Sequence, residues 1–137
     1  MKLIPAMLFI AVSAYSSVSG AADQSICNPT ASITLHPDGQ VSSCDLRSVY
    51  EQGSLKCNAY NLITFYKSGK LQSCVLYEDY THDGVPCGDL GTISFYESGK
   101  IRSCTLDKSY TIAGKNCIRA QPIHLYENGA LRTCTEQ

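Results

Sequence analysis

The spacing of the eight cysteines is the strongest constraint on this chain of 137 residues. The intervals between successive cysteines alternate between 17 and 13 residues, which gives a period of 30 residues repeated four times without an insertion. Four in-phase copies of one unit predict a repeat array. The cysteines are Cys27, Cys44, Cys57, Cys74, Cys87, Cys104, Cys117 and Cys134.

Other residue types follow the same period. An isoleucine stands six residues after the leading cysteine of each unit, and a glycine stands twelve residues after it. The isoleucines are Ile33, Ile63, Ile93 and Ile123, and the glycines are Gly39, Gly69, Gly99 and Gly129.

The third unit shows what one copy folds into. Short β-favouring runs flank Glu97-Ser98-Gly99-Lys100, which is typical of a β-hairpin. A three-residue loop over 97–99, with glycine in the left-handed conformation, places Phe95 opposite Ile101 and Ile93 opposite Ser103. This register gathers Ile93, Phe95 and Ile101 on one face and sends Tyr96, Lys100, Arg102 and Cys104 to the other.

The sequence therefore predicts an all-β fold: an array of four 30-residue β-hairpin repeats that forms an antiparallel meander of about eight strands, stapled by disulfides. The spacers cross back to begin the next unit and are expected to cover the cysteine-bearing face. The apolar face needs a cover, or the sheet must curl. We expect one domain over 23–137, with units 27–56, 57–86, 87–116 and 117–137.

The first 22 residues are typical of a secretory signal peptide. Lys2 precedes an apolar stretch over 3–15, and small residues fill 16–22. A membrane anchor is the alternative, but the apolar run is shorter than the about 20 residues that a span needs. We expect cleavage near residues 20–22, a mature chain without a transmembrane span, and a secreted or periplasmic location.

Export favours disulfides over free thiols, and all eight cysteines follow the cleavage region. Two regular pairings are open. Pairing across the spacers (Cys44–Cys57 and its equivalents) leaves Cys27 and Cys134 at opposite ends of an open array. Pairing within each unit satisfies every thiol and is favoured: Cys27–Cys44, Cys57–Cys74, Cys87–Cys104 and Cys117–Cys134.

Metal, cofactor and redox sites are not expected. Zinc sites and redox-active dithiols use close cysteine pairs, whereas the shortest spacing here is C-x12-C. Glu78, Asp79 and Asp83 form an acidic cluster but lack the alternating oxygen ligands of a calcium loop.

Three segments resemble the MORN repeat: 65–71 (Phe-Tyr-Lys-Ser-Gly-Lys-Leu), 95–101 and 125–131. They are most similar to the cysteine-containing variant of bacterial exported and antitoxin-like repeat proteins. In the first unit, His36-Pro37-Asp38-Gly39-Gln40 replaces the pattern. The resemblance implies a β-hairpin array that acts as a scaffold or binds proteins or lipids, and it implies no catalytic residues.

Little in the chain points to catalysis or to nucleic acid. The formal net charge of −1 gives no electrostatic case for a nucleic-acid partner. His36, His82 and His124 occupy different repeat positions, and no nucleophile elbow is present. We expect a protein that is not an enzyme; convergence of a histidine and a carboxylate in a cleft would indicate otherwise.

The candidate ligand-binding residues are aromatic. Tyr66, Tyr96 and Tyr126 share one repeat position, with His36 in the first unit. Two strands apart, they would be spaced by about 10 Å. Such a ladder could stack on sugar rings or hold an extended peptide, or its rings could pack beneath the spacers.

The predicted function is thus an exported, non-catalytic binding or structural module. Its partner would be a protein or an envelope polymer, bound through the tyrosine-bearing sheet face. The outer strands, over 31–36 and 130–134, could instead take up a partner strand, although Pro37 would discourage it. The alternative function is a small secreted effector or inhibitor that acts through a spacer loop, with 78–86 as the candidate loop.

Overall fold

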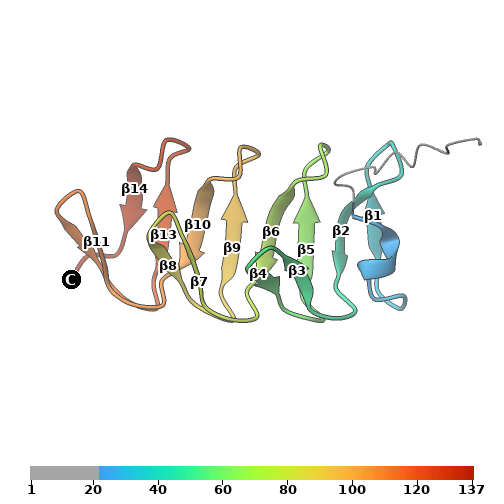
Figure 1. Ribbon diagram of the computed structural model, residues 1–137, viewed down its shortest axis with the longest axis horizontal. Helices are drawn as coiled ribbons and strands as arrows, with labels where there is room; N and C mark the ends of the chain where they lie inside the picture. The colour runs from blue at the N-terminus through green and yellow to red at the C-terminus, as the bar shows by residue number, and fades with distance from the viewer. Residues whose placement is uncertain (1–21) are drawn as a thin grey trace, which may run out of the picture.

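The computed structural model describes residues 22–137, and within them one eight-stranded antiparallel sheet runs the length of the molecule (Figure 1). The expected signal peptide lies outside the described residues, apart from Ala22. The strand order is β1-β2-β5-β6-β9-β10-β13-β14, so each unit contributes one hairpin and successive hairpins pair edge to edge. The strands are β1 (Ile33–Leu35), β2 (Val41–Asp45), β5 (Leu62–Phe65), β6 (Leu71–Val75), β9 (Thr92–Phe95), β10 (Ile101–Thr105), β13 (Pro122–Leu125) and β14 (Leu131–Cys134).

The fold class is the predicted one: an all-β array of hairpin repeats with four disulfides. The outer strands are β1 and β14, which lie within the segments expected at the two edges. The one helical element of the described residues is a short 3-10 turn, η1 (Gln24–Ile26). No helix in residues 22–137 has the length and apolar character that crossing a membrane requires.

Each spacer folds into a second, smaller hairpin that lies over one face of the sheet (Figure 1). In the second spacer, Asp83 and Gly84 both have positive φ angles, of 50° and 80°. Such two-residue loops match the twist of the flanking strands. The hairpins are β3 (Tyr50–Gln52) with β4 (Leu55–Cys57), β7 (Tyr80–His82) with β8 (Val85–Cys87), and β11 (Tyr110–Ile112) with β12 (Lys115–Cys117).

The register of the main hairpins confirms one part of the prediction and corrects another. Phe95 pairs with Ile101 across the loop, and Gly99 has a φ of +89°, as expected. Ser103, however, pairs with Ser94 and not with Ile93, because a β-bulge at Arg102 adds a residue to strand β10.

The bulge changes the face on which the cysteine lies. Cys104 was expected opposite the apolar face, but the extra residue returns it to the side of Ile93 and Phe95. The apolar face and the cysteine face are therefore one face. The small hairpins cover it, so the sheet needs no closure to bury its core.

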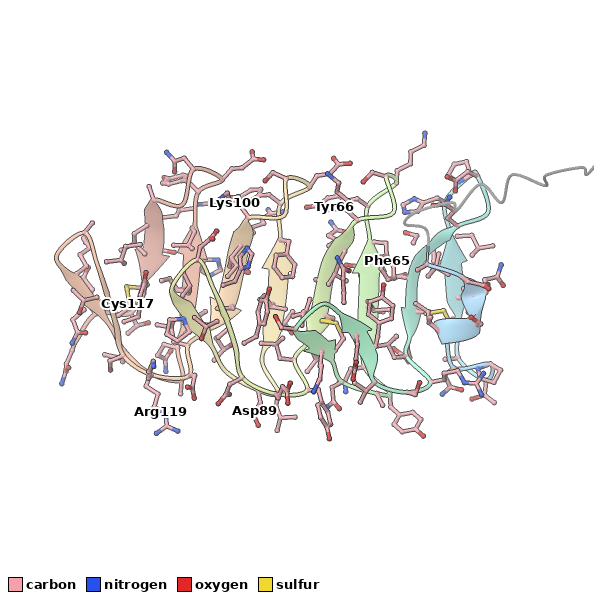
Figure 2. All side chains as sticks on the ribbon, in the orientation of Figure 1. Phe65, Tyr66, Asp89, Lys100, Cys117 and Arg119 are labelled. Atoms are coloured by element: carbon pink, nitrogen blue, oxygen red, sulfur yellow. A yellow bond between two sulfur atoms is a disulfide. The ribbon has the colours of Figure 1, made fainter. Side chains whose placement is uncertain are left out.

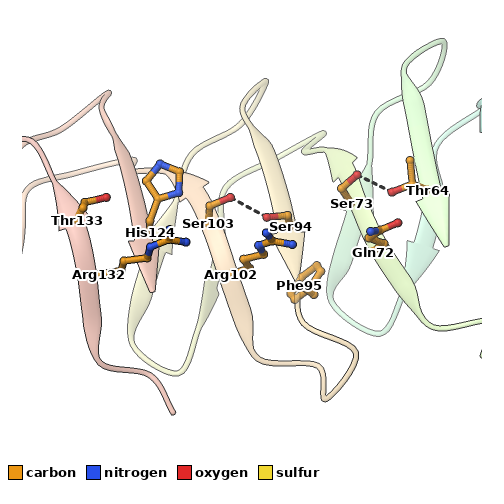
Figure 3. A pocket seen from close by; sticks show the side chains of 10 residues that line it. All are labelled: Thr64, Gln72, Ser73, Ser94, Phe95, Arg102, Ser103, His124, Arg132 and Thr133. Carbon is orange, nitrogen blue, oxygen red and sulfur yellow. Dashed lines mark hydrogen bonds between the residues drawn. The ribbon is translucent and has the colours of Figure 1, made fainter. Parts of the chain in front are cut away.

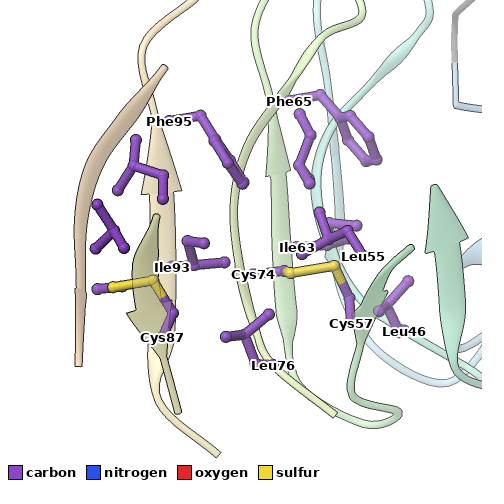
Figure 4. Packing of buried hydrophobic residues seen from close by; sticks show 14 of the residues in the cluster. Leu46, Leu55, Cys57, Ile63, Phe65, Cys74, Leu76, Cys87, Ile93 and Phe95 are labelled. Carbon is purple, nitrogen blue, oxygen red and sulfur yellow. A yellow bond between two sulfur atoms is a disulfide. The ribbon is translucent and has the colours of Figure 1, made fainter. Parts of the chain in front are cut away.

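The core is one continuous cluster between the sheet and the small hairpins. In the second unit, Ile63, Cys57 and Leu76 are fully buried, and Leu55 from strand β4 packs in the same cluster. Figure 4 shows how the same residue types recur from one unit to the next. Each unit thus supplies an isoleucine and a disulfide to a core that no single hairpin could form, and the first three units add a buried leucine, at Leu46, Leu76 and Leu106.

All eight cysteines form disulfides within their own units. The bonds join Cys27–Cys44, Cys57–Cys74, Cys87–Cys104 and Cys117–Cys134. Each ties the start of a unit to the second strand of its hairpin, 17 residues later. Four disulfides in so small a domain indicate an oxidising environment outside the cytoplasm.

Candidate functional site

The opposite face of the sheet has no covering layer among the described residues, and it carries a continuous row of polar side chains. One residue from each of the eight strands lies in register with its neighbours, so the row crosses the whole sheet. Neighbouring strands lie about 4.8 Å apart, which sets the spacing of the row. Its members are Thr34, Ser43, Thr64, Ser73, Ser94, Ser103, His124 and Thr133.

The hydroxyls of this row pair within hairpins. Thr64 and Ser73 lie 2.6 Å apart, oxygen to oxygen, and Ser94 and Ser103 lie 2.6 Å apart (Figure 3). Each hydroxyl has one proton and two lone pairs, and a pair uses one proton between its members. The second proton of each pair and the remaining lone pairs are therefore free to bind a ligand.

Two arginines flank this row at the bulge position of their strands. Arg102 and Arg132 occupy the position held by Gln72 in the second unit and Ser42 in the first. The Arg102 guanidinium carbon lies 5.7 Å from the centre of the Tyr96 ring, which holds the cation at the edge of the face. Neither guanidinium forms an ion pair with a carboxylate of the described residues.

Arginines and hydroxyls together line an open groove of about 740 Å³ on this face (Figure 3). No aspartate or glutamate is among the lining residues. The groove is therefore basic although the whole chain is slightly acidic. Its lining comprises Thr64, Gln72, Ser73, Ser94, Phe95, Arg102, Ser103, His124, Arg132 and Thr133.

The predicted tyrosine ladder lies at the loop end of the sheet and joins one unit to the next. The Tyr66 hydroxyl donates to the Phe95 carbonyl at 2.7 Å, and the Tyr96 hydroxyl donates to the Leu125 carbonyl at 2.8 Å. In the first unit, Nε2 of His36 lies 3.0 Å from the Phe65 carbonyl. We call these three contacts the unit braces.

The braces give three of the four predicted ligand-binding residues a structural contact, while the role of all four in binding stays a prediction. Tyr66 and Tyr96 are half-buried, whereas Tyr126, in the last unit, is 52% exposed. The sequence showed the shared repeat position but not the partner, because a backbone carbonyl one unit away has no signature in the sequence.

The hydroxyl row and its arginines were not among the predicted site residues. Ser43, Ser73, Ser103 and Thr133 were visible as a repeat, just before the trailing cysteines. Their partners on the neighbouring strands could be recognised only once the bulge had fixed the register.

The three histidines have three different settings. His36 belongs to a unit brace, and His124 lies in the exposed polar row. His82 stacks on Tyr80, packs edge-on against Phe95, and lies 3.6 Å from the carboxylate of Asp83. Burial raises the pKa of the phenols of Tyr50 and Tyr80 above their usual value.

The spacer segment 78–86, through which the alternative effector function would act, is held against the sheet. In the segment 78–86, Val85 and Pro86 of strand β8 are buried, and the Asp83 carboxylate at the tip of the hairpin contacts Lys100 at 3.3 Å. In residues 22–137 no group of three or more His, Cys, Asp or Glu side chains is placed to hold a metal ion.

Comparison with known proteins does not place the chain in a family. No protein-family model, no curated protein and no solved structure matches it. The likeness to MORN repeats thus stays a resemblance, and the hairpin repeat with one disulfide per unit is what the structure establishes.

Proposed function

We propose that this chain is an exported, non-catalytic binding module whose open sheet face takes up an anionic polymer of the cell envelope or its surroundings. The observation that carries the proposal is the uncovered row of hydroxyls beside two arginines that have no carboxylate partner on the described residues. The ligand class follows from charge, shape and repeat spacing.

The charge of the groove favours acidic groups. Arg102 and Arg132 present planar guanidinium groups, which bind carboxylates, sulfates and phosphates through paired hydrogen bonds. With no carboxylate in the lining, an incoming anion meets no repulsion from the groove itself. A neutral polymer could accept hydrogen bonds from these two arginines but would lack the charge attraction.

The shape of the face favours an extended ligand over a small molecule. The groove is open along the sheet, and the polar row continues across all eight strands. Arg102 and Arg132 stand two strands apart, a separation of about 10 Å. This spacing fits acidic groups on alternate sugars of an extended polysaccharide, whose hydroxyls would exchange hydrogen bonds with the serine row.

The tyrosines contribute at the rim of the same face. The Tyr96 ring lies beside the Arg102 guanidinium, so a sugar ring that reaches the loop end of the groove would meet an aromatic surface.

We also propose that the units are of the MORN type. The recurring hairpin loop, in which the Gly99 N–H donates to the Tyr96 carbonyl, supports this proposal because the Tyr-x-x-Gly core of the resemblance forms that loop.

The test is binding of the exported protein to an immobilised acidic polysaccharide, with a neutral glucan as the comparison. Wild-type protein should be retained by the acidic polymer, and retention should fall as salt is raised because exposed ion pairs are screened. The double variant Arg102→Gln, Arg132→Gln should lose at least several-fold in affinity.

The matched control is Arg119→Gln, which removes an exposed arginine of the last spacer without touching the groove (Figure 2). It should bind as the wild type does. A loss from Arg119→Gln as large as that from Arg102→Gln alone would show that net charge drives retention, and equal binding to the neutral glucan would contradict the anionic ligand class.

A further inference from the structure

Each of the two edge strands of the sheet presents one side of the interface that joins neighbouring units inside the array. Inside the array, the second strand of each hairpin pairs with the first strand of the next, at β2–β5, β6–β9 and β10–β13. The array begins with the first strand of a hairpin, β1, and ends with the second strand of another, β14. One copy's β14 is therefore the natural partner of another copy's β1.

Burial at the β1 edge shows that an apolar surface lacks its neighbour there. Leu35 is 43% exposed, whereas its equivalents Phe65, Phe95 and Leu125 are 2%, 6% and 4% exposed. Ile33 is half-buried, although the corresponding isoleucines of the other three units are fully buried.

The β14 edge shows the complementary loss. Leu131 is half-buried, whereas its equivalents Val41, Leu71 and Ile101 are buried by the unit that follows each of them. Tyr126 is the fourth residue of the brace position, and its hydroxyl has no acceptor among the described residues. Repeat arrays stay apart in solution when a polar terminal unit covers such ends, and within residues 22–137 neither edge strand is covered in this way.

Backbone groups at both edges are available for pairing. The Leu46 N–H donates to the Asn61 carbonyl at 3.0 Å, which fixes the side of each strand that faces the next unit. Successive residues of a strand point their backbone groups to opposite sides. Inside the array, the backbone groups of Cys44 and Ile63 therefore face each other across β2 and β5. The equivalent residues at the ends are Cys134 on β14 and Ile33 on β1. The N–H and C=O of these two residues, and of Leu35, point away from the sheet at its free edges. Neither strand contains a proline that would remove a donor.

We propose that copies of this chain associate head to tail, with β14 of one copy pairing antiparallel to β1 of the next and extending the sheet. By the internal register, Cys134 would pair with Ile33 and Thr133 with Thr34 of the second copy. The Tyr126 hydroxyl would donate to the Leu35 carbonyl, completing a fourth brace, and Leu131 would pack against Leu35. The polar row would then continue from one copy into the next.

The test is sedimentation or light scattering of the full exported protein over a range of concentrations. Wild-type protein should grow in average mass as its concentration rises, because an open chain of head-to-tail copies keeps one free edge at each end to which a further copy can add. Leu35→Lys and Leu131→Lys each place a charge at one edge and should each remain monomeric.

Mixing the two variants separates head-to-tail pairing from other arrangements. Leu35→Lys keeps an intact β14 edge and Leu131→Lys keeps an intact β1 edge, so an equimolar mixture should form dimers and nothing larger. Leu62→Lys, on a central strand and 53% exposed, is the matched control and should associate as the wild type does. A peptide map with all four disulfides in place verifies that each variant is folded.

Three results would overturn the proposal. Wild-type protein that stays monomeric at every concentration would show that the edges do not pair with copies of this chain. Self-association of either single variant would indicate pairing of like edges. Loss of self-association in the Leu62→Lys variant as well would place the contact on the open face.

Discussion

At the scale of the residue, the fold depends on a few positions that recur in every unit. Ile93 is fully buried beneath the second small hairpin and lies beside the disulfide of its own unit (Figure 4). These positions could be predicted, because apolar residues at a fixed period mark the face that each unit buries. The braces could not be predicted, since their acceptors are backbone carbonyls.

The central isoleucines should carry more of the stability than the one at the edge. Ile93→Ala is expected to lower the free energy of unfolding by roughly 2–5 kcal/mol, because it leaves a cavity in a packed core. Ile33→Ala removes the same side chain from the half-buried position on strand β1 and should cost less than half as much. Urea unfolding of both variants measures the difference, and equal losses would contradict the burial pattern.

The buried phenols predict a loss of stability at high pH. Burial raises the pKa of Tyr50 in the folded chain, so the unfolded chain ionises this group at a lower pH than the folded chain does. The folded state therefore keeps its full stability below the ordinary tyrosine pKa near 10 and loses part of it as pH rises through the folded value.

The Tyr50→Phe variant checks this origin. Its free energy of unfolding should fall less steeply than that of the wild type between neutral and strongly alkaline pH, because one ionisation has been removed. Spectroscopic unfolding curves measured quickly at each pH compare the two slopes. A wild-type slope that the substitution leaves unchanged would assign the alkaline loss to other groups.

At the scale of the element, hairpins were predictable and their fine register was not. The loop over 97–99 followed from side-chain parity, but parity counting fails where a bulge inserts a residue, and Cys104 was therefore assigned to the wrong face. The spacer hairpins carried a sequence signal in Asp83-Gly84, a dipeptide typical of two-residue turns. The open face became visible only after both features had been placed.

The contact between neighbouring hairpins includes the unit brace, and its contribution can be isolated. Tyr96→Phe removes the hydroxyl that donates to the Leu125 carbonyl and should cost about 0.5–1.5 kcal/mol of unfolding free energy. Tyr126→Phe is the matched control, because that hydroxyl has no acceptor in the single chain as described. At a dilution where the protein is monomeric, thermal unfolding should separate the two variants; identical midpoints would argue against the brace.

At the scale of the whole molecule, residues 22–137 form an array in which these residues leave one face and both edges of the sheet uncovered. The disulfides and small hairpins stabilise the covered face, whereas no second layer of residues 22–137 packs against the open face. Because each unit contacts only its neighbours, stability should vary along the array. The terminal units, with one neighbour each, should unfold before the central ones.

Removal of single disulfides tests this gradient. Closing a loop of this length stabilises a chain by about 3 kcal/mol in the chain-entropy estimate. Replacing Cys87 and Cys104 together by alanine should cost about that much in the cooperative unfolding of the array. The Cys27 and Cys44 pair closes a loop of the same length in the first unit, and its loss should affect global unfolding less. Chemical unfolding without thiol reagents compares the two variants, and an equal cost would mean that the array unfolds as one block.

The most direct measurement is the intact mass of protein recovered from its native compartment, with and without reductant, followed by a peptide map under non-reducing conditions. An oxidised array of this kind must weigh eight hydrogens less than its reduced form, and its map must contain the links Cys27–Cys44, Cys57–Cys74, Cys87–Cys104 and Cys117–Cys134. Free thiols, or links across the spacers such as Cys44–Cys57, would contradict the stapled scaffold and with it the open face and edges that depend on it.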